Sequence, residues 1–151
     1  MSGTKIRSKF FEVKDDLVKI VGDGPLYDNQ LTKICKDLFG KEYLGTFAQD
    51  QIPVSKKGFC IINVDTSKQD GSHWVALVFQ ANKCYVYDTF GRNVKRLLPI
   101  LSEKLQKYKI IKIATDPHPE QYGTTNVCGH LCIAFLFCVR KYGINRVVKI
   151  I

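Results

Sequence analysis

The amino-acid sequence predicts one α+β domain, in which a small, mostly antiparallel sheet packs against helices. Two observations indicate this class. Short apolar runs between residues 59 and 88 are typical of buried strands. Apolar residues also recur at helical spacing on both sides of that region. The length of 151 residues suits one domain, which we expect to span residues 1–151.

The first third of the chain is predicted to hold one helix. Residues 1–28 are charged and weakly patterned, with a turn at residues 22–25. Asn29 is a candidate N-cap, and Gly40 is a candidate C-terminal stop. The helix between them presents one apolar face, formed by Leu31, Ile34, Cys35, Leu38 and Phe39. We expect an irregular segment over residues 41–57.

The central residues predict three strands, two of which form a hairpin. Residues 59–64 read as a buried strand. Residues 73–80 and 84–88 are joined by a tight turn and read as an antiparallel pair.

A helix, a strand and a second helix are expected after the hairpin. Leucines and Val94 recur at helical spacing up to Leu105, and Pro99 should kink that helix or open it. A further strand is expected over residues 109–114. A largely apolar helix should then begin near Cys128.

The composition limits the function classes. No apolar run approaches the roughly 20 residues that cross a bilayer, and the N-terminal residues lack the apolar core of a signal peptide. We therefore expect a protein that is not secreted, has no membrane partner and stays in a reducing compartment. The six cysteines then read as free thiols rather than as a disulfide framework.

The net charge of +9 favours binding to polyanions such as duplex DNA, but it equally fits an ordinary lysine-rich surface. Four lysines recur along one predicted helix-strand segment and form a candidate DNA-binding patch: Lys104, Lys107, Lys109 and Lys112.

Cys128, His73 and Asp88 are the candidates for chemistry. Cys128 stands where a polar loop meets an apolar helix, and the helix dipole there favours the nucleophilic thiolate. His73 opens one strand of the hairpin and Asp88 closes the other, so both should lie at the same end, where the carboxylate can orient the imidazole. Taken singly, each position also fits a residue without a catalytic role.

Gln121 precedes Cys128 by seven residues. Its side-chain amide and the backbone N–H of Cys128 could together stabilise an oxyanion, although a solvated loop glutamine looks the same in sequence. A metal site is not expected. On a helix His130 points away from the face that Cys128 and Cys132 share, and no second ligand cluster follows. The same geometry argues against His130 as the base.

Together these residues resemble the adenovirus endopeptidase (adenain) family and the related SUMO-type ubiquitin-like-protein peptidases. The shared order is His73-Trp74, then Asp88, then Gln121, then Cys128-Gly129. Further likeness to the adenoviral branch lies in the motif at residues 44–47, in the Asp-Thr-Phe-Gly at residues 88–91, in the seven-residue step from Gln to Cys and in the Cys-Gly-His-Leu-Cys at residues 128–132. The resemblance covers roughly residues 30–140.

The resemblance implies a cysteine endopeptidase with Cys128 as nucleophile at the start of a buried helix, His73 as base, Asp88 as its orienter and Gln121 in the oxyanion hole. It also implies that Gly45, Thr46, Trp74 and Gly129 contact substrate. The implied substrates are viral precursor proteins, cut at Gly-containing sites during virion maturation. The implied location is the virion and the host nucleus or cytoplasm, and we expect a monomer that needs no cofactor for its chemistry.

Two departures from the family bear on activation and origin. The family's cysteine that bonds an activating viral peptide corresponds to a position near Ile110, so a disulfide-linked activator is not expected. DNA or a non-covalently bound peptide remains a candidate activator. The sequence ends at Ile151, soon after the nucleophile helix. We therefore expect a shortened enzyme of an adenovirus-like DNA virus or a virus-like mobile element.

Three other functions stay open at this level. A SUMO or ubiquitin-like-protein peptidase would use the same chemistry on another substrate, although residues 44–47 favour the adenoviral branch. A related acetyltransferase would share the order of histidine, acid and cysteine. A basic nucleic-acid-binding domain would make the three residues a coincidence, but no alternation of basic and aromatic residues supports it.

Overall fold

The structure is a computed structural model that describes residues 3–53, 57–64, 73–81, 83–88, 98–104, 109–112 and 127–150. Its helices are α1 (Gly3–Val21), α2 (Asp28–Phe39), α4 (Pro99–Lys104), α5 (Cys128–Tyr142) and α6 (Ile144–Ile150), with short 3-10 turns η1 (Gly40–Glu42) and η2 (Gln49–Gln51). Its strands are β1 (Tyr43–Ala48), β2 (Lys57–Asn63), β3 (Trp74–Gln80), β4 (Lys83–Tyr87) and β5 (Lys109–Lys112).

The five strands form one sheet in the order β1-β2-β3-β4-β5. The two central pairings, β2 with β3 and β3 with β4, are antiparallel, whereas β1 with β2 and β4 with β5 are parallel. The α+β class is confirmed, but the sheet is mixed rather than mostly antiparallel. Parallel neighbours need a crossover between them, and the segment that contains α4 joins β4 to β5.

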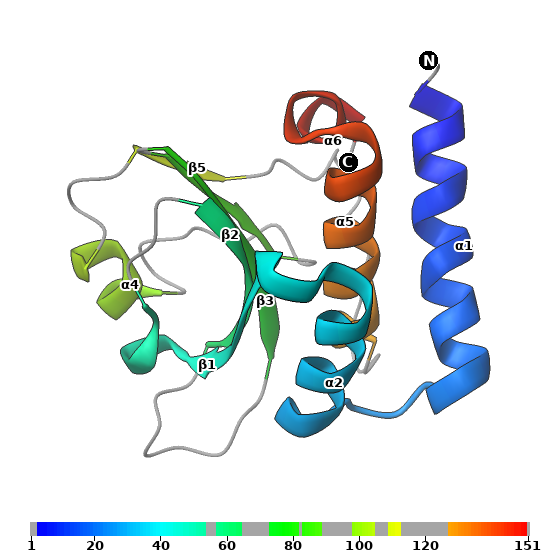
Figure 1. The fold of residues 1–151 in the computed structure, drawn as a ribbon, viewed down its shortest axis with the longest axis horizontal. Coiled ribbons are helices and arrows are strands. Elements are labelled where there is room, and N and C mark those ends of the chain that lie inside the picture. Colours follow the sequence, from blue (N-terminus) through cyan, green and yellow to red (C-terminus); the bar gives the residue numbers. More distant parts are fainter. Residues whose placement is uncertain are drawn as a thin grey trace.

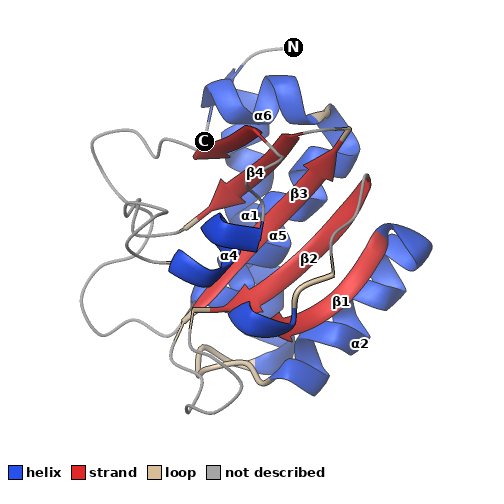
Figure 2. Ribbon diagram, turned by 90° about the vertical axis from the view of Figure 1, so that its left-hand side faces the viewer, coloured by secondary structure: helices blue, strands red, loops and turns tan. Residues whose placement is uncertain are grey.

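Helices cover both faces of the sheet unequally. In Figure 1, α1, α2, α5 and α6 lie on one side and α4 lies on the other; Figure 2 shows the strands from the α4 side. Successive strand residues point to opposite faces, so Phe59 and Ile61 join the core under the four helices while Cys60 and Ile62 join a smaller core on the other side. The central strands are buried on both faces for this reason.

Helix α1, strand β1 and the short helix α6 were not predicted from the sequence. Residues 1–28 were expected to be weakly patterned, yet α1 buries Ile6, Phe10 and Leu17, with Val13 and Val21 partly buried beside them. This spacing brings all five to one face of a helix, although the charged residues between them hide it. Strand β1 replaces part of the irregular segment expected over residues 41–57.

Helix α5 is the centre of the larger core. Twelve of its residues are buried, and the Phe135 ring stacks on that of Tyr87 with centroids 4.4 Å apart. In the part of the chain that the structure describes, no helix is both long and apolar enough to cross a bilayer.

Part of the predicted helix around Pro99 lies in the described residues, as α4. Pro99 is the first residue of α4, as expected of a proline in a helix's first turn, and Leu98 before it is fully buried. The other residues of the helix predicted from Val94 to Leu105, which are 94–97 and 105, lie outside the described ranges.

Candidate active site

Three chain segments bring His73, Asp88 and Cys128 together. His73 directly precedes β3, Asp88 directly follows β4, and Cys128 is the first residue of α5. In the antiparallel register Ala76 of β3 lies opposite Tyr87 of β4, so the start of one strand adjoins the end of the other. Helix α5 packs against β3, which sets its first residue beside that end of the hairpin.

The His73 imidazole and the Asp88 carboxylate form a buried contact of 2.6 Å between Nε2 and Oδ1. Both residues are almost fully buried, at 6% and 3% exposure. Burial alone lowers the pKa of the His73 imidazole, but its hydrogen bonds with Asp88 and Cys128, together with their charges, leave that pKa above its ordinary value. Asp88 therefore holds the ring in place and favours its protonated form.

The Cys128 thiol is also hydrogen-bonded to this imidazole. Since Nε2 faces Asp88, the ring nitrogen that can exchange a proton with the thiol is Nδ1. Burial raises the pKa of the thiol, but hydrogen bonds with His73 and with the backbone at Trp74 and Gly129, and the His73 charge, bring it below its ordinary value. Opposite shifts in the two groups favour a thiolate next to an imidazolium.

The five remaining cysteines lack this environment. All six cysteines are buried free thiols. Burial raises the pKa of three of the others to about 12 and that of two further ones well above the ordinary value: Cys35, Cys84 and Cys138, and Cys60 and Cys132 respectively. Cys128 is thus the one thiol of the chain whose surroundings stabilise the anion.

Comparison with known proteins agrees with the chemistry that this geometry allows. The adenovirus endoprotease family model matches residues 39–149. This chain belongs to the adenovirus endoprotease family. It is 24% identical over 115 residues to a protease of bovine adenovirus 4, which is 66% of this chain and 57% of that protein. It is 25% identical over 97 residues to a protease of bovine adenovirus 7, which is 56% of this chain and 48% of that protein.

The chain spans about half the length of the curated relatives it matches. Helix α1 and nearly all of α2 lie before the residues that match the adenovirus endoprotease family model. Gln121, the predicted second donor to the oxyanion, lies outside the described residues.

Gly45 and Thr46, both predicted to contact substrate, lie on β1, which β2 separates from β3. Thr46 accepts a hydrogen bond of 2.9 Å from the Thr32 hydroxyl of α2 and also contacts the Tyr43 hydroxyl. Gly45 has a φ of +142°, and a Cβ there would lie 2.7 Å from the Phe47 ring. A glycine is therefore needed at the irregular pairing near the start of β1.

Trp74 and Gly129, the other two predicted substrate contacts, border the residues of the α1–α2 connection. The Trp74 indole N–H donates a 2.9 Å hydrogen bond to the backbone oxygen of Leu26. A Cβ at Gly129 would come within 3.3 Å of the Leu26 and Leu31 side chains. Both residues therefore have a packing role at the edge of the site, and their contact with substrate stays a prediction.

His130 is turned away from the thiol, as the helical geometry predicted. Its side chain is fully buried, and its Nε2 lies 2.7 Å from the backbone oxygen of Gly22. Sequence reasoning missed this contact, because its partner is 108 residues away along the chain.

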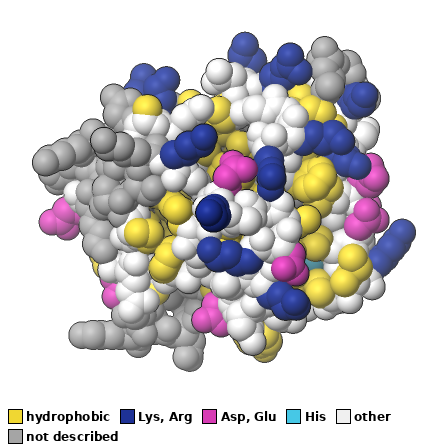
Figure 3. Space-filling view, viewed as in Figure 1, with side chains coloured by type: hydrophobic (Ala, Val, Ile, Leu, Met, Phe, Trp, Pro, Cys, Tyr) yellow, Lys and Arg dark blue, Asp and Glu magenta, His cyan; other side chains and the backbone are white. Residues whose placement is uncertain are grey.

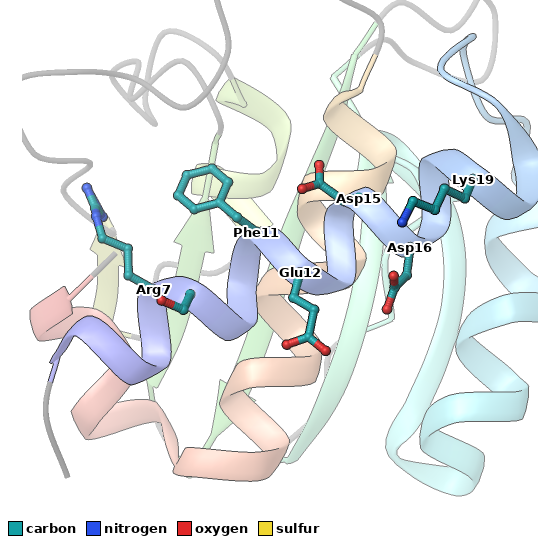
Figure 4. A pocket seen from close by; sticks show the side chains of 7 residues that line it. Arg7, Phe11, Glu12, Asp15, Asp16 and Lys19 are labelled. Carbon is teal, nitrogen blue, oxygen red and sulfur yellow. The ribbon is translucent and has the colours of Figure 1, made fainter.

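The described residues indicate no metal centre, and the hollow along α1 is not an enclosed ligand site. No group of three or more His, Cys, Asp or Glu side chains is placed to bind an ion in the described ranges. An open hollow of about 530 Å³ follows the outer face of α1, and its described lining mixes both charges: Arg7, Ser8, Phe11, Glu12, Asp15, Asp16 and Lys19. Figure 4 shows these side chains along a single helix, as expected of a solvated surface.

Proposed function

We propose that this chain is a cysteine endopeptidase that cleaves viral precursor proteins at Gly-containing sites during virion maturation. The observation that carries the proposal is the buried 2.6 Å contact between His73 and Asp88 beside the Cys128 thiol. Membership of the adenovirus endoprotease family supports the substrate class. The two bovine adenovirus proteins that the chain resembles are themselves named proteases.

The first half of the proposed reaction acylates Cys128. The thiolate attacks the carbonyl carbon of the scissile peptide bond, and the developing oxyanion takes hydrogen bonds from the backbone N–H of Cys128 and the Gln121 side-chain amide. The N–H groups at the start of α5 have no partner within the helix, so they are available to this charge. The His73 imidazolium then gives its Nδ1 proton to the leaving amine, and the C–N bond breaks.

The second half releases the new carboxylate. Neutral His73 removes a proton from water, the hydroxide attacks the thioester carbonyl, and the C–S bond breaks to return the thiolate and the imidazolium. Asp88 keeps Nδ1 aimed at the reacting atoms through its bond to Nε2 in both halves. The chemistry needs no metal or organic cofactor.

We also propose that duplex DNA binds the basic surface and localises or activates the enzyme in the virion and in the host nucleus or cytoplasm. Apart from the backbone of Lys104 and Lys112 and the exposed Lys109, the lysine patch proposed from the sequence lies outside the described residues. Lys and Arg side chains are spread over the face that Figure 3 shows, with several toward its top. Helix α6 contacts α1, and basic residues of these two helices include Lys5, Arg7, Lys9, Arg146 and Lys149.

Cleavage profiling on a peptide library, with and without duplex DNA, tests the proposal. The wild-type protein should cut after a consistent motif that contains glycine. Cys128→Ala is the matched control and should show no cleavage in the same preparation. A wild-type protein that cuts no peptide in either condition, or a Cys128→Ala variant that cuts as well, would sink the proposed function.

A further inference from the structure

The short connection between α1 and α2 is held by two side chains that neighbour the predicted catalytic residues. His130 donates from Nε2 to the backbone oxygen of Gly22, at 2.7 Å. Trp74 donates from its indole N–H to the backbone oxygen of Leu26, at 2.9 Å. Trp74 follows His73 directly, and His130 lies two residues after Cys128. One six-residue connection, residues 22–27, thus joins the start of β3 to the start of α5.

Further contacts close this arrangement around the predicted nucleophile. Leu26 packs against Gly129, where even a Cβ would come within 3.3 Å of it. The Cys132 thiol, one turn into α5, donates to the backbone oxygen of Trp74 at 3.5 Å. The contacts of Gly22 and Leu26 in the α1–α2 connection therefore help to fix the distance between α5 and β3. That distance in turn determines how close the Cys128 thiol comes to the His73 ring.

The protonation of the two His130 ring nitrogens follows from the contact with Gly22. Because the Gly22 oxygen can only accept, Nε2 carries the proton and Nδ1 carries none. That Nδ1 is buried without a hydrogen-bond partner among the described groups. Burial of such an atom costs stability unless the other end of the ring is well bonded. Burial, ahead of the nearby charges, also holds the pKa of the imidazole below its ordinary value, so the ring is neutral near pH 7.

We propose that His130 is a positioning residue for the reaction, and that its hydrogen bond to the α1–α2 connection holds the Cys128 thiol against His73. The inference rests on the proposed function. It goes beyond the likeness to the adenovirus endoproteases, because Gly22 and Leu26 lie before the matched residues 39–149. The N-terminal region is on this account part of the active-site framework.

The experiment compares three variants with the wild type. His130→Leu introduces an apolar side chain of similar bulk and removes the Nε2–H donor. His130→Gln can instead place an amide N–H near the position of Nε2. Arg140→Gln is the matched control: it removes the 2.6 Å hydrogen bond from Arg140 to the Leu38 oxygen, which joins the C-terminal end of α5, far from Cys128, to α2. Each variant is assayed well below its midpoint of thermal unfolding.

Two readouts separate positioning from a general loss of stability. The first is the pH midpoint of iodoacetamide labelling at Cys128, followed by peptide mass spectrometry, which needs no substrate. The second is the division of the effect between kcat and KM. We expect His130→Leu to raise the labelling midpoint and to lower kcat about tenfold, the scale of one lost buried hydrogen bond, with KM nearly unchanged. His130→Gln should recover most of both, and Arg140→Gln should match the wild type.

A folded His130→Leu variant with the wild-type midpoint and kcat would overturn the inference, even if its thermal stability were lower. If His130→Leu does not fold, His130→Asn replaces it, because the shorter amide cannot reach the Gly22 oxygen; equal midpoints for Asn and Gln would again overturn the inference. A failure of the proposed function looks different. The wild type would then cleave no peptide, while the labelling midpoints would still report on His130.

Discussion

Replacement of Asp88 by asparagine removes the charge that faces the His73 ring while keeping the shape of the side chain. The contact is short, at 2.6 Å, and both side chains are nearly buried, at 8% and 4% exposure for His73 and Asp88. A hydrogen bond to a charged group contributes about 1.5–3 kcal/mol, against about 0.5–1.5 kcal/mol for a neutral one. The change should therefore cost about 1–2 kcal/mol of imidazolium stabilisation, which corresponds to a rate loss of about 5–30-fold near neutral pH.

The pH profile gives the sign of the effect. The hydrogen bond to Asp88 raises the pKa of His73, so its loss should lower that pKa and move the alkaline fall in kcat/KM to lower pH. The contact with protonated His73 lowers the pKa of Cys128, so the acid-side rise should move to higher pH. The pH range in which thiolate and imidazolium coexist should thus narrow from both sides.

The assay measures kcat/KM for one peptide substrate between pH 5 and pH 10, with the pH dependence of Cys128 labelling measured in parallel. The Asp88→Glu variant serves as the control that keeps the charge, and it should retain more activity than Asp88→Asn. An Asp88→Asn profile as wide as that of the wild type would refute our account of how Asp88 acts on His73.

Four further predictions test separate parts of the structure. His73→Ala should lose at least ~100-fold in rate, the usual scale for a general base, and more than Asp88→Asn does; an equal loss in both would make the carboxylate as important as the ring. Cys132→Ala should stay active, because burial holds the pKa of that thiol well above its ordinary value; an inactive, folded Cys132→Ala variant would indicate Cys132 rather than Cys128 as the nucleophile. Phe135→Ala should lower the free energy of unfolding by about 3–5 kcal/mol in a urea titration, because it removes a fully buried stacked ring; a loss below about 1 kcal/mol would contradict the packing of α5. Duplex DNA should bind with a log–log salt slope near −3.6 if about four phosphates are neutralised, and replacing Arg146 and Lys149 with glutamine should make the slope shallower; no binding at low salt would remove DNA as a partner.

The hairpin and helix α5 were predictable because their signals are local. Two apolar strands around a tight turn fix which ends meet, so His73 and Asp88 could be expected together before their 2.6 Å contact was measured. The start of α5 at Cys128 follows from an abrupt change from polar to apolar residues. Strand β5 begins at Lys109, as expected, and α4 begins at Pro99, which is one of the two positions in a helix that the sequence allowed for this proline.

Other features could not be predicted because they depend on contacts between distant segments. Strand β1 forms by parallel pairing with β2, which no short sequence pattern specifies. The two carbonyl contacts of the α1–α2 connection join residues 108 and 48 positions apart. Helix α1 differs from these cases, because the spacing of its apolar residues was present in the sequence and the dense charge around them concealed it.

The central claim, that Cys128 is the nucleophile, is tested most directly by the residual peptide-cleavage rate of Cys128→Ala. The rate should be measured beside Cys132→Ala, with circular dichroism used to establish that both variants are folded. Our account predicts no cleavage above the uncatalysed background for Cys128→Ala and near wild-type cleavage for Cys132→Ala, since only the first thiol is hydrogen-bonded to His73. Cleavage by a folded Cys128→Ala variant at a rate comparable to that of the wild type would contradict it.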